Sequence, residues 1–254
     1  MTIHGYFCNM TFSSISMAKL LLAILLLTAA HSAPPRLRVH VYGAMRNFML
    51  QGNMAGKVQL DTLARPHLYG LGVAEGLQGE YLLWDGHAAR TRVTSNKRTA
   101  TDTAWTGRAA LLVTSRVPRW QPAEAVPTTV LDESALQQFI ARRAAQQGLD
   151  TSQAFVFRLQ GQPEQVQWHV MDWPRGATIK HTMQNHKQYA ASGQMSRQAV
   201  EMLGFFSRRH HGVFIHHTAL MHLHVRPAGE AFAAHVDGLR WRPGQLRLQL
   251  PAAY

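Results

Sequence analysis

The stretch MHLHVRPAGEAFAAHV (residues 221–236) predicts a β-hairpin near the C-terminal end of the sequence. Alternate residues of a strand project from the same face, so His222 and His224 would point in one direction. Pro227 and Gly229 supply turn chemistry directly after the first apolar run. This stretch therefore predicts antiparallel sheet with two histidines on a common face.

Whether His235 joins that face depends on the length of the loop. An even loop, centred on Ala228-Gly229 or on Gly229-Glu230, would place His235 opposite His222 or His224, whereas an odd loop would place it on the other face unless a bulge intervened. Three imidazoles beside one open position are typical of a catalytic zinc site. The chain has 15 histidines, so a chance spacing is the competing interpretation.

The rest of the chain predicts an α+β fold with mixed or antiparallel β-sheets, few helices, and a metal site on the C-terminal hairpin. The clearest helix is 132–148, where apolar Leu136, Phe139, Ile140 and Ala144 recur at helical spacing. Runs on both sides of Gly161 predict another hairpin. Strands are expected at 37–42, in short runs within 67–93, and at 109–115, 155–159, 166–170, 203–207, 219–225, 231–236 and 246–250, and helical segments within 46–63 and 178–189.

The N-terminal residues have the pattern of a secretory signal peptide. Lys19 precedes an apolar run, 20–30, which is followed by small residues and by Pro34-Pro35. We expect Met17 to be the true start, residues 1–33 to be removed, and residues 34–254 to form the mature domain, with room for two packed β-rich subdomains. The protein would then be secreted or periplasmic and free of the membrane after cleavage. An uncleaved membrane anchor is the alternative.

Charge and cysteine usage restrict the function further. The formal net charge is +12, and it becomes +11 when the segment containing Lys19 is removed. A positive charge favours an anionic partner, such as nucleic acid, an anionic membrane surface or a small carboxylate substrate. The arginines are scattered, which disfavours nucleic acid and favours a merely soluble basic surface for most of these charges. The one cysteine, Cys8, lies before the apolar run, so a metal site in the mature chain would use histidine or carboxylate.

Two motifs together resemble the alpha-acetolactate decarboxylase family. The H-L-H triplet of residues 222–224, followed by His235 after ten residues, resembles the zinc-ligand signature of that family. The stretch YGLGVAEGLQGEYLLWDG (residues 69–86) resembles a second motif, in which Glu80 falls on an active-site glutamate. Arg92 matches a common family arginine. The resemblance extends from about Tyr42 to Leu250.

This resemblance implies zinc-dependent decarboxylation of 2-acetolactate, or of a related 2-hydroxy-3-keto acid, to acetoin and carbon dioxide. His222, His224 and His235 would bind Zn²⁺, and Glu80 would act on the metal-bound water or on the substrate hydroxyl. Arg92 would bind the substrate carboxylate. The partner is a small anionic keto acid, and the oligomeric state is left open, a homodimer included.

The sequence departs from the family in two places. Where the family has a threonine-arginine step that supplies an active-site arginine, this chain has Trp168-His169, and His169 is expected to stand in as a proton donor. The family also places a second active-site glutamate in a C-terminal tail, and this sequence reads LQLPAAY there. The alternative hypothesis is therefore a zinc-binding member of impaired catalysis that acts as a binding module.

Overall fold

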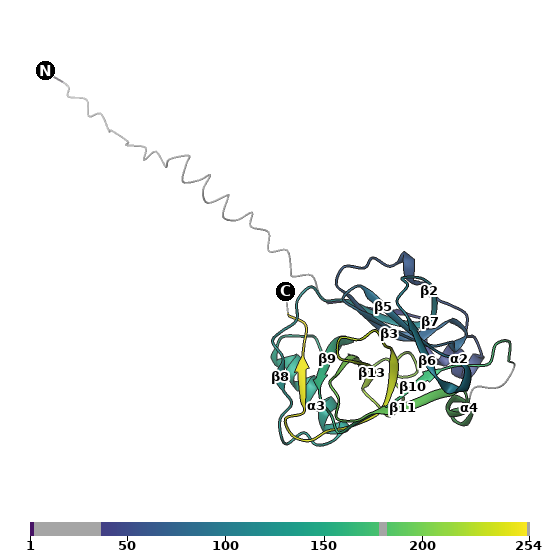
Figure 1. The fold of residues 1–254 in the computed structure, drawn as a ribbon. Coiled ribbons are helices and arrows are strands. Elements are labelled where there is room, and N and C mark those ends of the chain that lie inside the picture. The colour runs from purple at the N-terminus through teal and green to yellow at the C-terminus, as the bar shows by residue number, and fades with distance from the viewer. Residues whose placement is uncertain (3–36, 178–181, 253–254) are drawn as a thin grey trace. The chain divides into compact units, whose positions relative to one another are not determined.

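Two antiparallel sheets make up most of the computed structural model, which describes residues 1–2, 37–177 and 182–252 (Figure 1). The seven-stranded sheet has the order β1 (Val39–Tyr42), β7 (Arg108–Arg116), β3 (Leu68–Ala74), β4 (Glu80–Trp84), β5 (His87–Val93) and β6 (Thr99–Asp102), with β2 (Val58–Gln59) also paired to β7. The eight-stranded sheet has the order β11 (Ala190–Met195), β10 (Gln165–Met171), β14 (Ala234–Arg240), β13 (Met221–Pro227), β12 (Val200–Phe206), β9 (Phe155–Gly161), β15 (Leu246–Gln249) and β8 (Glu124–Ala125).

Helices are few in the described residues, which confirms the predicted α+β class. The α-helices are α2 (Met45–Gln51), α3 (Glu133–Gln146) and α4 (Met183–Gln188), and the 3-10 turns are Leu60–Thr62, Glu75–Leu77 and Ser95–Lys97. None of the described helices is long and apolar enough to cross a membrane. The predicted signal peptide and Cys8 lie outside the described residues.

Helix α3 covers one face of the eight-stranded sheet. It begins at the predicted position, because the Asp132 side chain accepts a hydrogen bond from the backbone N–H of Ala135 (2.8 Å). Its four expected apolar residues are buried in one core with Leu223 and Val225 of β13. These odd-numbered positions of β13 face the helix, so the even-numbered histidines face the opposite way.

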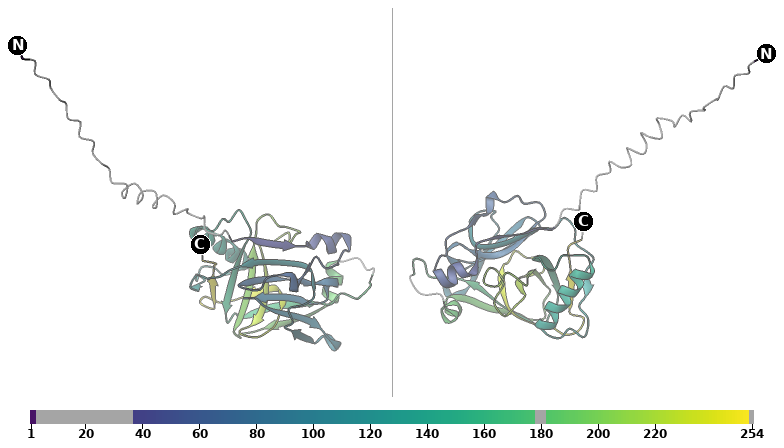
Figure 2. Two further views of the ribbon diagram at one scale, coloured as in Figure 1. Left: turned by 90° about the horizontal axis from the view of Figure 1, so that it is seen from above. Right: turned by 180° about the vertical axis from the view of Figure 1, so that it is seen from behind.

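The seven-stranded sheet lies over the other face of the eight-stranded sheet (Figure 2), and a second core contains residues of both sheets. It contains Leu71 and Leu82 from β3 and β4, and Leu203 and Phe205 from β12. Glu80 is two residues from Leu82 on β4 and therefore shares its inward face. The two sheets thus bring even positions of β4 and β13 toward one another.

The hairpin predicted around Gly161 is wrong. Strands β9 and β10 both form, but β9 pairs with β12 and β15, whereas β10 pairs with β11 and β14. In a flat sheet the four strand spacings between them would be about 19 Å, yet the link from Gly161 to Gln165 spans at most about 14 Å. The sheet is therefore strongly curled at this end, and each strand obtains partners that are distant in sequence.

Candidate metal centre

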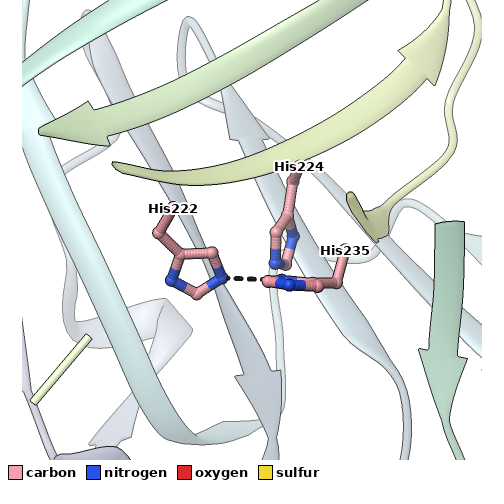
Figure 3. Close-up of side chains that lie close together, drawn as sticks. All are labelled: His222, His224 and His235. Atoms are coloured by element: carbon pink, nitrogen blue, oxygen red, sulfur yellow. Dashed lines mark hydrogen bonds between the residues drawn. The ribbon is translucent and has the colours of Figure 1, made fainter. Parts of the chain in front are cut away.

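The hairpin of β13 and β14 brings His222, His224 and His235 together (Figure 3). His224 lies directly opposite His235, and Val225 lies opposite Ala234. The pairing is centred between residues 229 and 230, which confirms an even loop and one of its two predicted centres. His222 is two residues before His224 and faces the same way, so one nitrogen of each ring lies within 4.8 Å of the others.

Backbone carbonyls fix the orientation of two of these rings. His222 Nδ1–H donates to the carbonyl of Phe214 (2.8 Å), and His224 Nδ1–H donates to the carbonyl of Tyr81 (2.9 Å). The Nε2 atom of each of these two neutral rings therefore carries no proton and has a lone pair. The lone pair of His222 Nε2 accepts a hydrogen bond from His235 Nδ1–H (2.9 Å). Such carbonyl partners are the usual outer contacts of metal-binding histidines.

Burial keeps the three imidazoles neutral. Burial is the largest cause of a lowered pKa at all three, and it lowers the pKa of His224 to about 3. The neighbouring imidazoles lower the pKa of His222 and His235 further. A neutral imidazole is the form that binds a metal ion, so protons would not compete for these nitrogens near neutral pH.

The donor set fits a divalent transition metal. Each of the three rings offers one nitrogen, and imidazole nitrogen is a usual zinc ligand. Imidazole ligands suit zinc, copper, iron and nickel, so the side chains alone do not select among these metals. Three protein ligands leave a coordination position for a small molecule.

Glu80 lies against this cluster, as its motif predicted. Its side chain is 4% exposed, and its Oε2 is 3.7 Å from His224 Nε2. Its Oε1 accepts a hydrogen bond from the backbone N–H of Met171 (3.3 Å). Burial raises the pKa of Glu80 well above its usual value, and the negative charge of Asp237 raises it further. The carboxyl group can therefore hold a proton beside the histidines.

His169 also faces the cluster, because it lies opposite His235 on the neighbouring strand β10. The two ring centres are 4.8 Å apart. A bulge between β10 and β14 leaves Asp237 without an opposite residue, and His169 Nδ1–H donates to its carboxylate (2.7 Å). A hydrogen bond of 3.0 Å joins His186 Nε2 of α4 to His169 Nε2, and either ring can carry its proton.

Arg92 is not brought to the histidines. It lies on β5, its side chain is 51% exposed, and it forms an ion pair with Asp102 (3.1 Å). It does not line the cavity that contains the other predicted site residues. We therefore assign the substrate carboxylate no contact with Arg92.

Three residues near the cluster were missed by sequence reasoning. Asp237 reaches His169 because of a β-bulge, and no local sequence pattern indicated that bulge. His186 lies on α4, and His216 lies in the loop before β13 with its ring 5.6 Å from that of His235. The sequence signal for His216 was the high density of histidines at 210–217. That density did not indicate where any of these side chains would lie in the fold.

The histidines lie at one side of a cavity of about 1000 Å³. Its polar wall includes Glu80, His169, His222, His235 and Asp237. Its apolar wall includes Met45, Phe48 and Met49 of α2, with Met171 and Met221 from the eight-stranded sheet. The fold and the cavity define this chain as an α+β protein with a candidate metal centre in an inter-sheet cavity.

The family comparison then identifies the chain. Residues 40–253 match the alpha-acetolactate decarboxylase family, so the chain belongs to that family. Its members are carboxy-lyases. No curated protein sequence matches this chain.

Solved structures show the same fold at low sequence identity. The alpha-acetolactate decarboxylase of Bacillus subtilis strain 168 has a TM-score of 0.66 and 14% identity, with 85% of each chain covered. A protein of unknown function from Staphylococcus aureus, described as similar to alpha-acetolactate decarboxylase, gives the same values. The acetolactate decarboxylase of Bacillus subtilis subspecies spizizenii has a TM-score of 0.65 and 14% identity, with 84% of this chain and 85% of that chain covered.

Proposed function

We propose that this protein is a zinc-dependent decarboxylase that converts 2-acetolactate, or a related 2-hydroxy-3-keto acid, to acetoin and carbon dioxide. The observation that supports it most is the set of three neutral, converging imidazoles beside a buried Glu80, in a chain of this family. His222, His224 and His235 would hold the zinc ion, which supplies a Lewis acid when bound.

The reaction breaks the bond between the carboxylate carbon and its neighbour. The electron pair of that bond moves toward the ketone oxygen, carbon dioxide leaves, and one proton must be delivered to carbon to give the product. His169 is the nearest imidazole outside the ligand set, and Asp237 holds its Nδ1, so its Nε2 is the atom we assign to hold that proton. The buried carboxyl of Glu80 would bind the substrate hydroxyl.

The substrate carboxylate needs a cation, and Lys187 of α4 would supply it. Among the described residues that line this cavity, Lys187 is the one lysine or arginine, whereas Glu80, Glu133 and Asp237 are acidic. The ammonium group would draw a small keto acid into a cavity whose other ionisable groups are neutral or acidic.

Metal content and acetoin formation test this function together. We expect the purified protein to contain stoichiometric zinc and to form acetoin from 2-acetolactate, and His224→Ala to lose both. The zinc affinity of the variant should fall more than about 100-fold, beyond the loss seen for an outer partner of a ligand. His67→Ala is the control, because His67 is exposed and pairs with Asp85. A protein without bound metal would refute the proposal.

The second candidate is a zinc-binding member of the family without turnover. The motivating feature is the resemblance by which His169 stands where the family has an arginine, so that a charge fixed at every pH would be lost. Normal zinc content, with no decarboxylation of any short 2-hydroxy-3-keto acid, would favour this candidate.

Export of the protein to a secreted or periplasmic location is also proposed. The apolar run at 20–30 and the small residues after it support this proposal. Mass spectrometry of the exported protein should find an N-terminus near residue 34. Full-length chain retained in the cytoplasm would contradict it.

A further inference from the structure

The cavity is larger than the proposed substrate needs. A volume of about 1000 Å³ lies at the upper end of the range of about 300–1,000 Å³ found for pockets that hold drug-sized ligands. 2-Acetolactate is a five-carbon acid whose polar groups would occupy the polar wall beside the histidines. Most of the apolar wall would then have no substrate atoms against it.

That apolar wall is built from one side of α2. Met45 and Phe48 are buried in the core between the sheets, and Met49 packs against the same core. These three side chains have no polar group able to pair with a hydroxyl or a carboxylate, so a polar substituent placed there would lose its hydrogen bonds to water. Burial of an alkyl group against these side chains would have a favourable free energy, because apolar surface is removed from water.

The position of this wall is tied to a ligand histidine. The backbone N–H of Met45 donates to the carbonyl of Val213 (2.7 Å), and that of Arg46 donates to the carbonyl of Gly212 (2.9 Å). The next carbonyl, that of Phe214, accepts the hydrogen bond from His222 Nδ1–H. The loop of residues 212–214 therefore sets both the orientation of the His222 ring and the position of α2.

Methionine is a recurring residue type in the lining. Met45, Met49, Met171 and Met221 all line the cavity. Methionine is unbranched and adapts its shape to irregular apolar groups, so such a wall can fit chains of different length.

From these observations we infer that the substrates include 2-hydroxy-3-keto acids with an alkyl substituent of several carbons, seated against Met45, Phe48 and Met49. This inference rests on the proposed function and extends its substrate class. The chemistry is unchanged: the bond to the carboxylate breaks, its electron pair moves toward the ketone oxygen, and one proton is added to carbon.

The test compares 2-hydroxy-3-keto acids that carry a methyl, ethyl, propyl or butyl group at the hydroxyl-bearing carbon. Each methylene that becomes buried should raise kcat/KM about fourfold, as expected from the free energy of burying one CH₂ group. Met49→Trp should lower kcat/KM for the butyl acid more than for the methyl acid, because the larger ring fills the apolar wall. Leu50→Trp is the matched control, since Leu50 is on the same helix but 81% exposed.

The possible outcomes separate this inference from the function beneath it. Turnover of the methyl acid with lower kcat/KM for every longer acid overturns the inference and leaves the proposed function intact. Zinc binding without turnover of any member overturns the proposed function.

In that second case, calorimetry with unreactive 2-hydroxy-2-alkyl acids still decides the inference. Affinity for the zinc-loaded protein that rises about fourfold per methylene supports it, and affinity independent of chain length overturns it. The same titration applies if Met49→Trp fails to fold, because it needs only the unaltered protein.

Discussion

Strands β4 and β13 place polar residues between the sheets at two locations that differ in kind. On β13, His222 and His224 share a face with Arg226, and on β4 Glu80 shares a face with Trp84. We call the first location the histidine end (Glu80, His169, His222, His224 and His235). The second location is the arginine end (Trp84, Trp120, Arg158, Glu201 and Arg226).

At the arginine end the cations have partners in the protein. Arg226 pairs with Glu201 (2.7 Å), and its guanidinium lies 4.1 Å from the ring centre of Trp84. Arg158 lies 4.2 Å from the ring centre of Trp120 and donates to Gln249 (2.6 Å). Burial lowers the pKa of Arg158. Neither arginine lines the histidine cavity, so these contacts hold the sheets together.

At the histidine end, one side of the His222 and His224 rings contacts backbone carbonyls and the other side faces the neighbouring imidazoles. The Nδ1–H groups of His222 and His224 are held by carbonyls, whereas the lone pairs converge beside the cavity. Polar groups satisfied within the protein stabilise the fold. Converging lone pairs beside open space are suited to a ligand.

Outside the ligand set, the largest expected effect is that of His169→Gln on turnover. If His169 holds the proton for the product, kcat should fall about 10²–10⁴-fold, the range for loss of a general acid or base. Zinc content should stay stoichiometric, because His169 is outside the ligand set. His87→Gln is the control, since His87 is exposed and contacts the carbonyl of Asp85. Unchanged kcat would show that the proton comes from elsewhere.

The second prediction concerns the stability of the metal-free protein in acid. The folded pKa values of His222, His224 and His235 are depressed below 6.5, so below that pH the unfolded chain takes up protons that the folded protein does not. Their contribution to stability is therefore complete above pH 6.5 and is lost as pH falls toward about 3, the pKa of His224. Each group changes the free energy of unfolding by about 1.4 kcal/mol per pH unit.

Glu80 acts in the opposite direction, because its folded pKa is raised and its protonated form favours the folded state as pH falls toward 4.5. Three histidines opposed by one carboxyl give a net loss of stability as pH falls below 6.5. Urea denaturation at pH 7.5 and 5.5 measures the free energy of unfolding of the metal-free protein. Between these two pH values, His235→Leu should lose less stability than the unaltered protein. Equal stability at the two pH values would mean that these histidines are not buried as neutral groups.

The smallest expected effect belongs to the arginine end. Arg226→Met removes the pair with Glu201 and the contact with Trp84, and the free energy of unfolding should fall by about 1–2 kcal/mol. Arg197→Met is the control, because Arg197 pairs with Glu164 while 73% exposed and should change stability by less than about 0.5 kcal/mol. Chemical denaturation and zinc content are measured together. Loss of zinc in Arg226→Met would remove the distinction between the two ends.

Local rules predicted much of the fold. Asp85-Gly86 forms the tight turn between β4 and β5, with both residues at positive φ, as hairpin turns with Asp-Gly do. The α3 boundaries also follow from nearby residues, whereas the β13–β14 register was one of several that the sequence allowed. The β9–β10 hairpin failed because the partners of a strand depend on the curl of the whole sheet, and Arg92 is exposed because its strand face points away from the cavity.

By itself the sequence determined which side chains share a face. The period of two in a strand is a property of the backbone, so His222 and His224 share a face without further information. The structure decided that the loop is even and that His235 joins them. The tertiary structure decided what lies opposite that face. Glu80, the Tyr81 and Phe214 carbonyls and the α2 wall reach it only because burial of apolar residues across the chain packs two sheets together, and the bulge at Asp237 aims its carboxylate at His169.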